Sequence, residues 1–319
     1  MSKKNKILVT GGCGYKGTVL IPKLLDRGYS VICLDNCWFG NYLSEHPNLE
    51  IIKADILDQD VIPFSSIETI IHLASIANDP CGDLNPKLTW EVSVLATMKL
   101  LENAKRKGVG RIIYASSGSV YGVKQEHQVT EDLSLLPISE YNKTKMCAER
   151  VILSYQDSLA VQIVRPATVC GYSRRMRLDV AVNLLTMQAL TNKKITVLGG
   201  KQVRPNIHID DITDLYIFLL ENPTHQGIYN AGFENLSIIE IAEMVTKEIP
   251  AEIEVKPSND PRSYRLNSDK LLATGFSPKF SVSDAICEIK QKYETGILAD
   301  EDKFYNLRWM QKKLGDQIG

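Results

Sequence analysis

Residues 7–17 read Ile-Leu-Val-Thr-Gly-Gly-Cys-Gly-Tyr-Lys-Gly, and this stretch decides the fold class. The apolar run Lys6–Thr10 predicts a buried parallel strand, and apolar residues at helical spacing follow the last glycine. Gly11 permits a sharp turn, Gly14 leaves room for a pyrophosphate, and Gly17 lets the helix pack closely against the strand. Because a helix N-terminus attracts anions, the stretch predicts a dinucleotide-binding turn, with Tyr15 and Lys16 beside the phosphates.

The composition argues against several classes of function. The 319 residues carry a net charge of −1 with charges mixed throughout, so we expect no nucleic-acid partner and no membrane partner. No apolar stretch is long enough to span a bilayer and the first residues do not resemble a signal peptide, so we expect a cytoplasmic protein. The seven cysteines follow no disulfide or metal-ligand spacing, so we expect reduced thiols and no metal site.

Strands and helices alternate through the first 165 residues. Helical patterns separate further strands, which are predicted at residues 31–35, 49–55, 69–74, 111–116 and 162–165. This rhythm predicts an α/β fold with a doubly wound parallel sheet of the Rossmann type. From Pro166 onward the elements are shorter and less regular. We therefore expect residues 1–165 with 207–222 to form the dinucleotide-binding domain, and 166–206 with 223–319 to form a smaller mixed α/β substrate-binding cap.

An acidic residue ends the second predicted strand. Asp35 follows the glycine turn by about 20 residues, where a carboxylate would meet the adenosine ribose hydroxyls. A carboxylate there favours NAD and repels the 2′-phosphate of NADP, so the predicted cofactor is NAD. Asp55 and Ile56 are predicted to lie at the adenine. His72, a lone histidine in a buried run, is predicted to be a core residue rather than a catalyst.

Tyr141 and Lys145 lie four residues apart on a predicted helix and therefore share one face. An ammonium group beside a tyrosine favours the phenolate, which can act as a base. Spacing alone is also typical of an ordinary surface pair. Ser117 favours the catalytic interpretation, because it follows the fifth predicted strand, where a doubly wound sheet places its ligands. Its hydroxyl could hold the oxygen that Tyr141 deprotonates.

The sequence resembles the extended short-chain dehydrogenases/reductases of the NAD-dependent nucleotide-sugar epimerase/dehydratase type. The resemblance covers nearly the whole chain, and its motifs fall in the order and spacing of that family. They are the glycine stretch at 10–17, Leu34-Asp35-Asn36, Ala54-Asp55-Ile56, His72-Leu73-Ala74, residues 116–122, Tyr141-Asn142-Lys143-Thr144-Lys145 and residues 204–211.

The resemblance implies roles for individual residues. Ser117, Tyr141 and Lys145 would form the catalytic triad, and Tyr141 and Lys145 would also contact the cofactor. Asn36, Leu73, Ala74 and Ser75 would join the residues named above in binding NAD. A nucleotide-sugar substrate would be held by Ser117, Thr168, Asn183, Arg204 and Arg262, since guanidinium groups pair with diphosphates in a bidentate manner. A homodimer is implied, through helices at about 88–107 and 140–156.

Some positions depart from the family pattern. Lys16 replaces an apolar residue, Ser93 replaces a common Asn, and Thr168 begins an altered version of the motif Asn-Val-Tyr-Gly-Pro. The arginine-rich run 173–179 is predicted to be either a solvated loop or a clamp for a diphosphate or base at the cap.

Three reactions share oxidation of the sugar at C4. Return of the hydride to the other face gives an epimer, release of the ketone gives a 4-dehydrogenase, and loss of water gives a 4,6-dehydratase. Dehydratases of this family carry Asp-Glu directly after the hydroxyl residue, whereas Gly118 and Ser119 stand here. The prediction is therefore an epimerase first, a dehydrogenase second and a dehydratase third. An NAD-binding regulatory protein on the same fold stays open as a different class.

Overall fold

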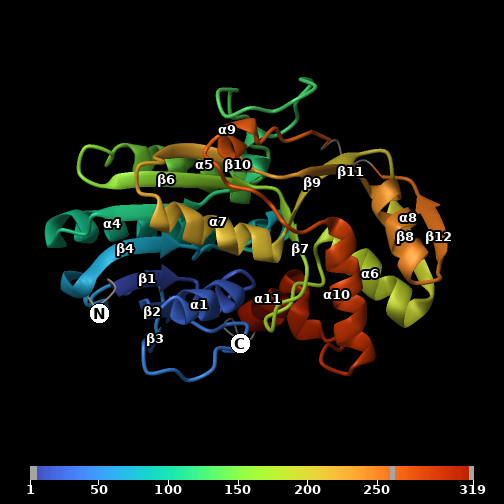
Figure 1. The fold of residues 1–319 in the computed structure, drawn as a ribbon, viewed down its shortest axis with the longest axis horizontal. Coiled ribbons are helices and arrows are strands. Elements are labelled where there is room, and N and C mark those ends of the chain that lie inside the picture. The colour runs from blue at the N-terminus through green and yellow to red at the C-terminus, as the bar shows by residue number, and fades with distance from the viewer. Residues whose placement is uncertain (1–5, 259–262, 316–319) are drawn as a thin grey trace.

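Seven parallel strands form the main sheet of the computed structural model, which describes residues 6–258 and 263–315 (Figure 1). Their order across the sheet is β10-β6-β5-β4-β1-β2-β3. The bounds are β1 (Lys6–Thr10), β2 (Ser30–Asp35), β3 (Leu49–Lys53), β4 (Ile67–His72), β5 (Arg111–Ala115), β6 (Ala160–Pro166) and β10 (Gly227–Ala231). The helices beside this sheet are α1 (Gly17–Asp26), α2 (Asp79–Leu84), α3 (Pro86–Trp90), α4 (Ala96–Lys107), α5 (Glu140–Leu153) and α7 (Ile209–Glu221).

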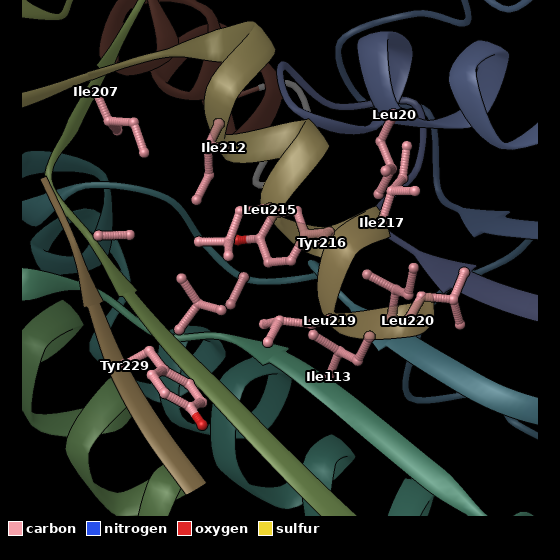
Figure 2. Packing of buried hydrophobic residues seen from close by; sticks show 14 of the residues in the cluster. Leu20, Ile113, Ile207, Ile212, Leu215, Tyr216, Ile217, Leu219, Leu220 and Tyr229 are labelled. Carbon is pink, nitrogen blue, oxygen red and sulfur yellow. The ribbon is translucent and has the colours of Figure 1, made fainter. Parts of the chain in front are cut away.

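Both faces of the sheet are buried, which explains why its strands are apolar without alternation. Ile113 of β5 packs with Leu215 and Tyr216 of α7 in one cluster (Figure 2). The preceding residue, Ile112, points to the opposite face and joins a second cluster with Leu100 of α4. Neighbouring residues of one strand thus enter different cores, as the period of two along a strand requires.

Most of the remaining elements gather at one end of the sheet, whereas α9 (Asp269–Leu272) lies beside β10 (Figure 1). The elements at that end comprise β7 (Thr168–Cys170), α6 (Ala181–Asn192), β8 (Lys194–Leu198), β9 (Val203–His208), β11 (Glu234–Ser237), α8 (Ile238–Glu248), β12 (Glu252–Lys256), α10 (Val282–Glu294) and α11 (Asn306–Gly315). Strands β11, β9 and β7 form one small sheet, and β12 pairs with β8 in another. A third apolar cluster holds α6, α8 and α10 together.

The predicted Rossmann fold is confirmed, whereas the expected boundary at residue 223 is wrong for one strand. β10 lies at the edge of the main sheet, where Gly227–Ala231 pair in parallel with β6. The short run of residues 227–231 does not indicate in the sequence that it belongs to the main sheet, because its pairing partners lie about 65 positions earlier in the chain.

The helix expected at about residues 88–107 is interrupted. A π-helical turn spans Glu91–Leu95, and α4 begins only at Ala96. This turn brings Ser93, the residue that replaces the common Asn, to within 3.4 Å of Ser75 (Oγ to Oγ). Such π turns are frequent at functional sites.

His72 is a core residue, as predicted. Its ring is fully buried, with Nδ1 2.6 Å from Thr10 Oγ1 and Nε2 2.9 Å from Thr97 Oγ1. Burial, reinforced by the charge of Lys145, lowers the pKa of His72 to about 3, so the ring is neutral at physiological pH. Among the described residues, no helix combines the length and apolarity needed to cross a membrane.

Candidate active site

One cavity of about 360 Å³ collects most of the predicted site residues. It runs from the glycine turn along the carboxyl ends of the parallel strands to the small β11-β9-β7 sheet, which is where ligands bind in open α/β sheets. Every residue predicted to bind the cofactor lines it: Gly11, Gly14, Tyr15, Lys16, Gly17, Asp35, Asn36, Asp55, Ile56, Leu73, Ala74, Ser75, Tyr141 and Lys145.

The glycines at one end of the cavity are required by close backbone approach. Gly11 has a φ of +70°, and a Cβ there would lie 2.6 Å from the Ala74 nitrogen. A Cβ on Gly17 would lie 2.3 Å from the Gly12 oxygen. The turn therefore holds the N-terminus of α1 at the cavity, and side chains at these positions would clash with the backbone of Ala74 and Gly12. These residues fit the pyrophosphate of a dinucleotide.

Asp35 lies at the end of β2 in the same cavity. Its carboxylate accepts hydrogen bonds from the backbone N–H groups of Cys13, at 3.0 Å, and Cys37, at 2.7 Å. Burial raises the pKa of this carboxyl, while the two hydrogen bonds and the charge of Arg175 oppose the rise. Each oxygen keeps a free lone pair, so the group fits the two hydroxyls of a ribose.

The predicted catalytic residues come together from two elements. Tyr141 and Lys145 lie one turn apart near the start of α5, and Ser117 follows β5. Ser117 lies close enough to Tyr141 to lower the pKa of the phenol, and its Oγ lies 2.7 Å from Ser119 Oγ. Lys145 Nζ donates to the Ala115 oxygen at 2.7 Å and lies 5.9 Å from the centre of the Tyr141 ring. The backbone of the strand therefore fixes Lys145 beside the tyrosine.

Burial controls the protonation of these groups. It raises the pKa of Tyr141 to about 12, assisted by the charge of Asp79 and opposed by the nearby Ser117 side chain and the charge of Arg177. Burial also lowers the pKa of Lys145 well below its usual range, and the charge of Lys16 adds to this effect. The expectation that Lys145 favours the phenolate is thus incomplete, because Arg177 is the cation that opposes the rise in this structure.

Lys16 adds a further cation to the cavity. Its Nζ donates to the Tyr216 hydroxyl at 3.4 Å, and burial, with the charge of Arg177, lowers its pKa to about 8. A lysine and two arginines, Arg175 and Arg177, therefore line the cavity beside the glycine turn. Buried cations of like charge are costly without an anion, and the arrangement fits a phosphorylated ligand.

The arginine-rich run 173–179 is a buried strap across the cavity, so the solvated-loop interpretation is wrong. Arg175 is only 2% exposed, lies 4.0 Å from the centre of the Phe39 ring and donates to Asn306 Oδ1 at 2.5 Å. Arg177 pairs with Asp179 through two hydrogen bonds of 3.0 Å. Among the described residues, Arg175 Nε has no hydrogen-bond partner, which leaves a buried donor for an anionic ligand.

The C-terminal helix also reaches this end of the cavity. Asn306 and Met310 of α11 line it, and Trp309 Nε1 donates to the Trp38 oxygen at 2.7 Å. No signal in the sequence indicates this placement, because nothing in a short amphipathic helix states which surface it covers. The sequence analysis also did not identify Asp79, which lines the cavity near Tyr141.

The predicted substrate residues are only partly brought together. Ser117, Thr168 and Arg204 line the cavity, and Arg262 lies outside the described residues. The prediction that Asn183 binds the substrate is wrong. Its side chain does not line the cavity and is fully buried in α6. Its Oδ1 accepts a hydrogen bond from the Gly171 N–H at 3.0 Å, and its Nδ2 donates to the Tyr15 hydroxyl at 3.1 Å. Asn183 therefore supports the glycine turn through Tyr15, on the side away from the cavity.

Comparisons with known proteins agree with this geometry. The profile of the NAD dependent epimerase/dehydratase family matches residues 7–232. UDP-glucuronic acid decarboxylase 1 of Arabidopsis thaliana is 30% identical over 319 residues, which covers 94% of this chain and 72% of the relative. A putative UDP-glucose 4-epimerase of Methanocaldococcus jannaschii is 29% identical over 294 residues, with 88% and 95% covered.

Solved structures give the same result. UDP-glucuronic acid 4-epimerase from Bacillus cereus, in complex with UDP-glucuronic acid and NAD, is 28% identical with a TM-score of 0.79, covering 90% of this chain and 100% of that one. UDP-glucose 4-epimerase from Thermus thermophilus, in complex with NAD, shares the fold with a TM-score of 0.82 at 24% identity, covering 91% and 99%. The cofactor is NAD, and the chain belongs to the NAD-dependent epimerase/dehydratase family, the extended short-chain dehydrogenases/reductases.

Proposed function

We propose that this enzyme inverts C4 of a nucleotide-activated sugar through a transient 4-ketone. The observation that carries the proposal is the single cavity in which Ser117, Tyr141 and Lys145 lie between the glycine turn and Arg204. A cofactor at the glycine turn and a diphosphate at Arg204 would place the sugar next to Tyr141.

The residues divide the acid–base work among themselves. Tyr141 accepts the proton of the C4 hydroxyl, Ser117 holds that oxygen, and Lys145 fixes the cofactor ribose beside both. NAD, when bound, supplies the acceptor and later the donor of the hydride. Tyr141 then returns the proton once the hydride has been delivered to the opposite face of the sugar.

The cofactor-binding residues named above are part of this proposal. Asp35 would bind the adenosine ribose, with Asp55 and Ile56 at the adenine. Arg204 and Thr168 would hold the sugar-phosphate end of the substrate, and Arg262 stays a prediction for the same diphosphate.

The residues after Ser117 argue against a 4,6-dehydratase. Gly118 supplies no acid or base, and Ser119 is engaged with Ser117 and with Asn142 Oδ1. Release of the ketone, as in a 4-dehydrogenase, needs no further residue. Only analysis of the product distinguishes this reaction from epimerisation.

One observation favours a second candidate, a nucleotide-uronic acid decarboxylase. The guanidinium group of Arg177 lies near enough to Tyr141 to lower its pKa, and Lys16 stands where the family has an apolar residue. These cations suit a carboxylate on the sugar. Oxidation of such a sugar at C4 makes a β-keto acid, which loses carbon dioxide.

We also propose that the enzyme forms a homodimer through α4 and α5. Leu95 and Met98 support this, because they are 54% and 46% exposed on the α4 side of the sheet. The seven cysteines are all unpaired, which supports a reducing, cytoplasmic location.

The test is a panel of nucleotide sugars, neutral and uronic, with mass and chromatographic analysis of the products. An epimer has unchanged mass and a new retention time, a ketone lacks two hydrogens, and a decarboxylated product lacks carbon dioxide. Epimerisation with no ketone released is the expected result. Absence of turnover, with tight NAD binding retained, would contradict the proposal and support the NAD-binding regulator.

A further inference from the structure

Three thiols and the Asp35 carboxylate lie close together at the end of β2, and of these four groups only Asp35 lines the cavity. Cys13 belongs to the glycine turn, Cys33 lies inside β2, and Cys37 follows Asp35. The Cys13 sulfur lies 3.8 Å from the sulfur of Cys33 and 3.8 Å from that of Cys37. One ligand atom each from Cys13, Asp35 and Cys37 falls within 4.8 Å of the other two.

We propose that Cys13, Asp35 and Cys37 form a binding site for a thiophilic divalent cation of the zinc class. Zinc binds thiolate sulfur at about 2.3 Å, so two sulfurs on a tetrahedral ion stand about 3.8 Å apart. The Cys13–Cys37 separation already has this value, and no large movement of either side chain is needed. The Asp35 carboxylate provides a third ligand.

The backbone holds this arrangement in place. Both N–H groups that fix Asp35 come from the two cysteines themselves, Cys13 at 3.0 Å and Cys37 at 2.7 Å. Cys37 has a φ of +57°, an uncommon conformation for a residue other than glycine. Asn41 Oδ1 lies 3.5 Å from the Cys13 sulfur and completes the polar surroundings.

Charge balance also permits a dication. Binding forms two metal–sulfur bonds and releases two thiol protons to solvent, with no change of oxidation state. Two thiolates and one carboxylate then carry three negative charges against two on the metal. The net negative charge faces Arg175, whose guanidinium already interacts with Asp35.

The site overlaps the ribose site of the proposed cofactor arrangement. Asp35 cannot bind a metal and two ribose hydroxyls at once, so the metal and NAD should exclude each other. This exclusion rests on the ribose assignment under "Proposed function", whereas metal binding itself does not.

The experiment titrates the reduced full chain, first freed of bound NAD, with Zn²⁺ by calorimetry and with Cd²⁺ by ultraviolet thiolate-to-metal absorption. We expect one ion per chain, and at least a roughly tenfold weaker affinity in Cys37→Ser. Cys37 is half-buried, so this variant is the less disruptive one, and Cys13→Ser is a second test. Cys287→Ser, at an exposed cysteine outside the cluster, is the matched control and should bind normally.

Saturating NAD should lower the Zn²⁺ affinity of the wild type. Equal Zn²⁺ binding by wild type and Cys37→Ser overturns the metal site, as does the absence of a thiolate-to-cadmium absorption band in the reduced wild type. Zinc binding that NAD does not alter overturns the exclusion alone. Because no turnover is measured, failure of the proposed reaction leaves these results unchanged.

Discussion

At the scale of single residues, the proposed chemistry depends on the protonation of Tyr141. The cavity that hides the reaction from water also raises the pKa of this phenol to about 12. A base with so high a pKa works near neutral pH only if nearby groups favour the phenolate. Ser117 and Arg177 provide such interactions, and a positively charged nicotinamide acts in the same direction.

Tyr141→Phe keeps the ring packing and deletes only the ionisable oxygen. We expect turnover of the nucleotide sugar to fall by about 10²–10⁴-fold, the usual contribution of a general base, with NAD binding unchanged. The measurement is a single-turnover rate together with cofactor content. Tyr155→Phe, which loses a hydroxyl bonded to Glu102 on the surface, is the control and should keep the wild-type rate. A normal rate in Tyr141→Phe would falsify the base assignment.

Arg177 should set the pH at which the enzyme becomes active. Its positive charge lowers the pKa of Tyr141, and the reaction needs the phenolate. Arg177→Met should therefore move the acidic limb of kcat/KM to higher pH, while Arg177→Lys keeps most of the wild-type profile. The neighbouring Arg174 is exposed and bonds to Ser44, so Arg174→Met should leave the profile in place. A profile that Arg177→Met does not move removes this residue from the electrostatics of the base.

At the scale of elements, two segments distant in sequence meet over one end of the cavity. The strap at residues 173–179 and helix α11 are joined by the Arg175–Asn306 hydrogen bond, and α11 is fixed to the loop after β2 by Trp309. This closure suits a cofactor that stays bound while the sugar is oxidised and reduced again.

Arg175→Met should therefore loosen NAD. Loss of a charged hydrogen bond costs about 1.5–3 kcal/mol, which corresponds to a faster dissociation of roughly 10- to 100-fold. The readout is the NAD retained after gel filtration and its dissociation rate. Gln311→Ala, at an exposed position of α11, is the control. Equal retention in Arg175→Met and wild type would show that the strap does not hold the cofactor.

At the scale of the whole molecule, one cavity joins the seven-stranded sheet to the small β11-β9-β7 sheet. The proposed catalytic residues come from the large sheet and α5, and Arg204 comes from the small sheet. Catalysis therefore depends on the packing of the two parts, and α5 would serve both the active site and the proposed dimer.

Leu95→Asp should disrupt the proposed dimer, because it would bury a charge without a partner at the α4 interface. Sedimentation velocity should show a dimer for the wild type and mainly monomer for the variant. Leu198 is exposed to a similar extent, 55% against 54%, but lies in β8 of the cap, so Leu198→Asp should stay dimeric. A monomeric wild type, or a dimeric Leu95→Asp, contradicts this interface.

The sequence by itself determined the order of most main-sheet elements, the glycine turn and the candidate catalytic residues that line the cavity. These features depend on local chemistry: apolar periodicity, the freedom of glycine and the spacing of Tyr141 and Lys145 within one helix. Such signals are contained within a few residues, and the main strands, the Rossmann fold and the family were therefore predictable.

Only the tertiary structure decided how distant segments meet. It placed β10 in the main sheet, buried Asn183 behind the glycine turn and laid Arg175 and α11 over the cavity. It also brought the Cys13 and Cys37 sulfurs to within 3.8 Å of each other, although the two residues are 24 positions apart and match no spacing rule for metal ligands. Such contacts depend on the packing of whole elements, whose partners are chosen by shape and burial summed over many residues rather than by any short motif.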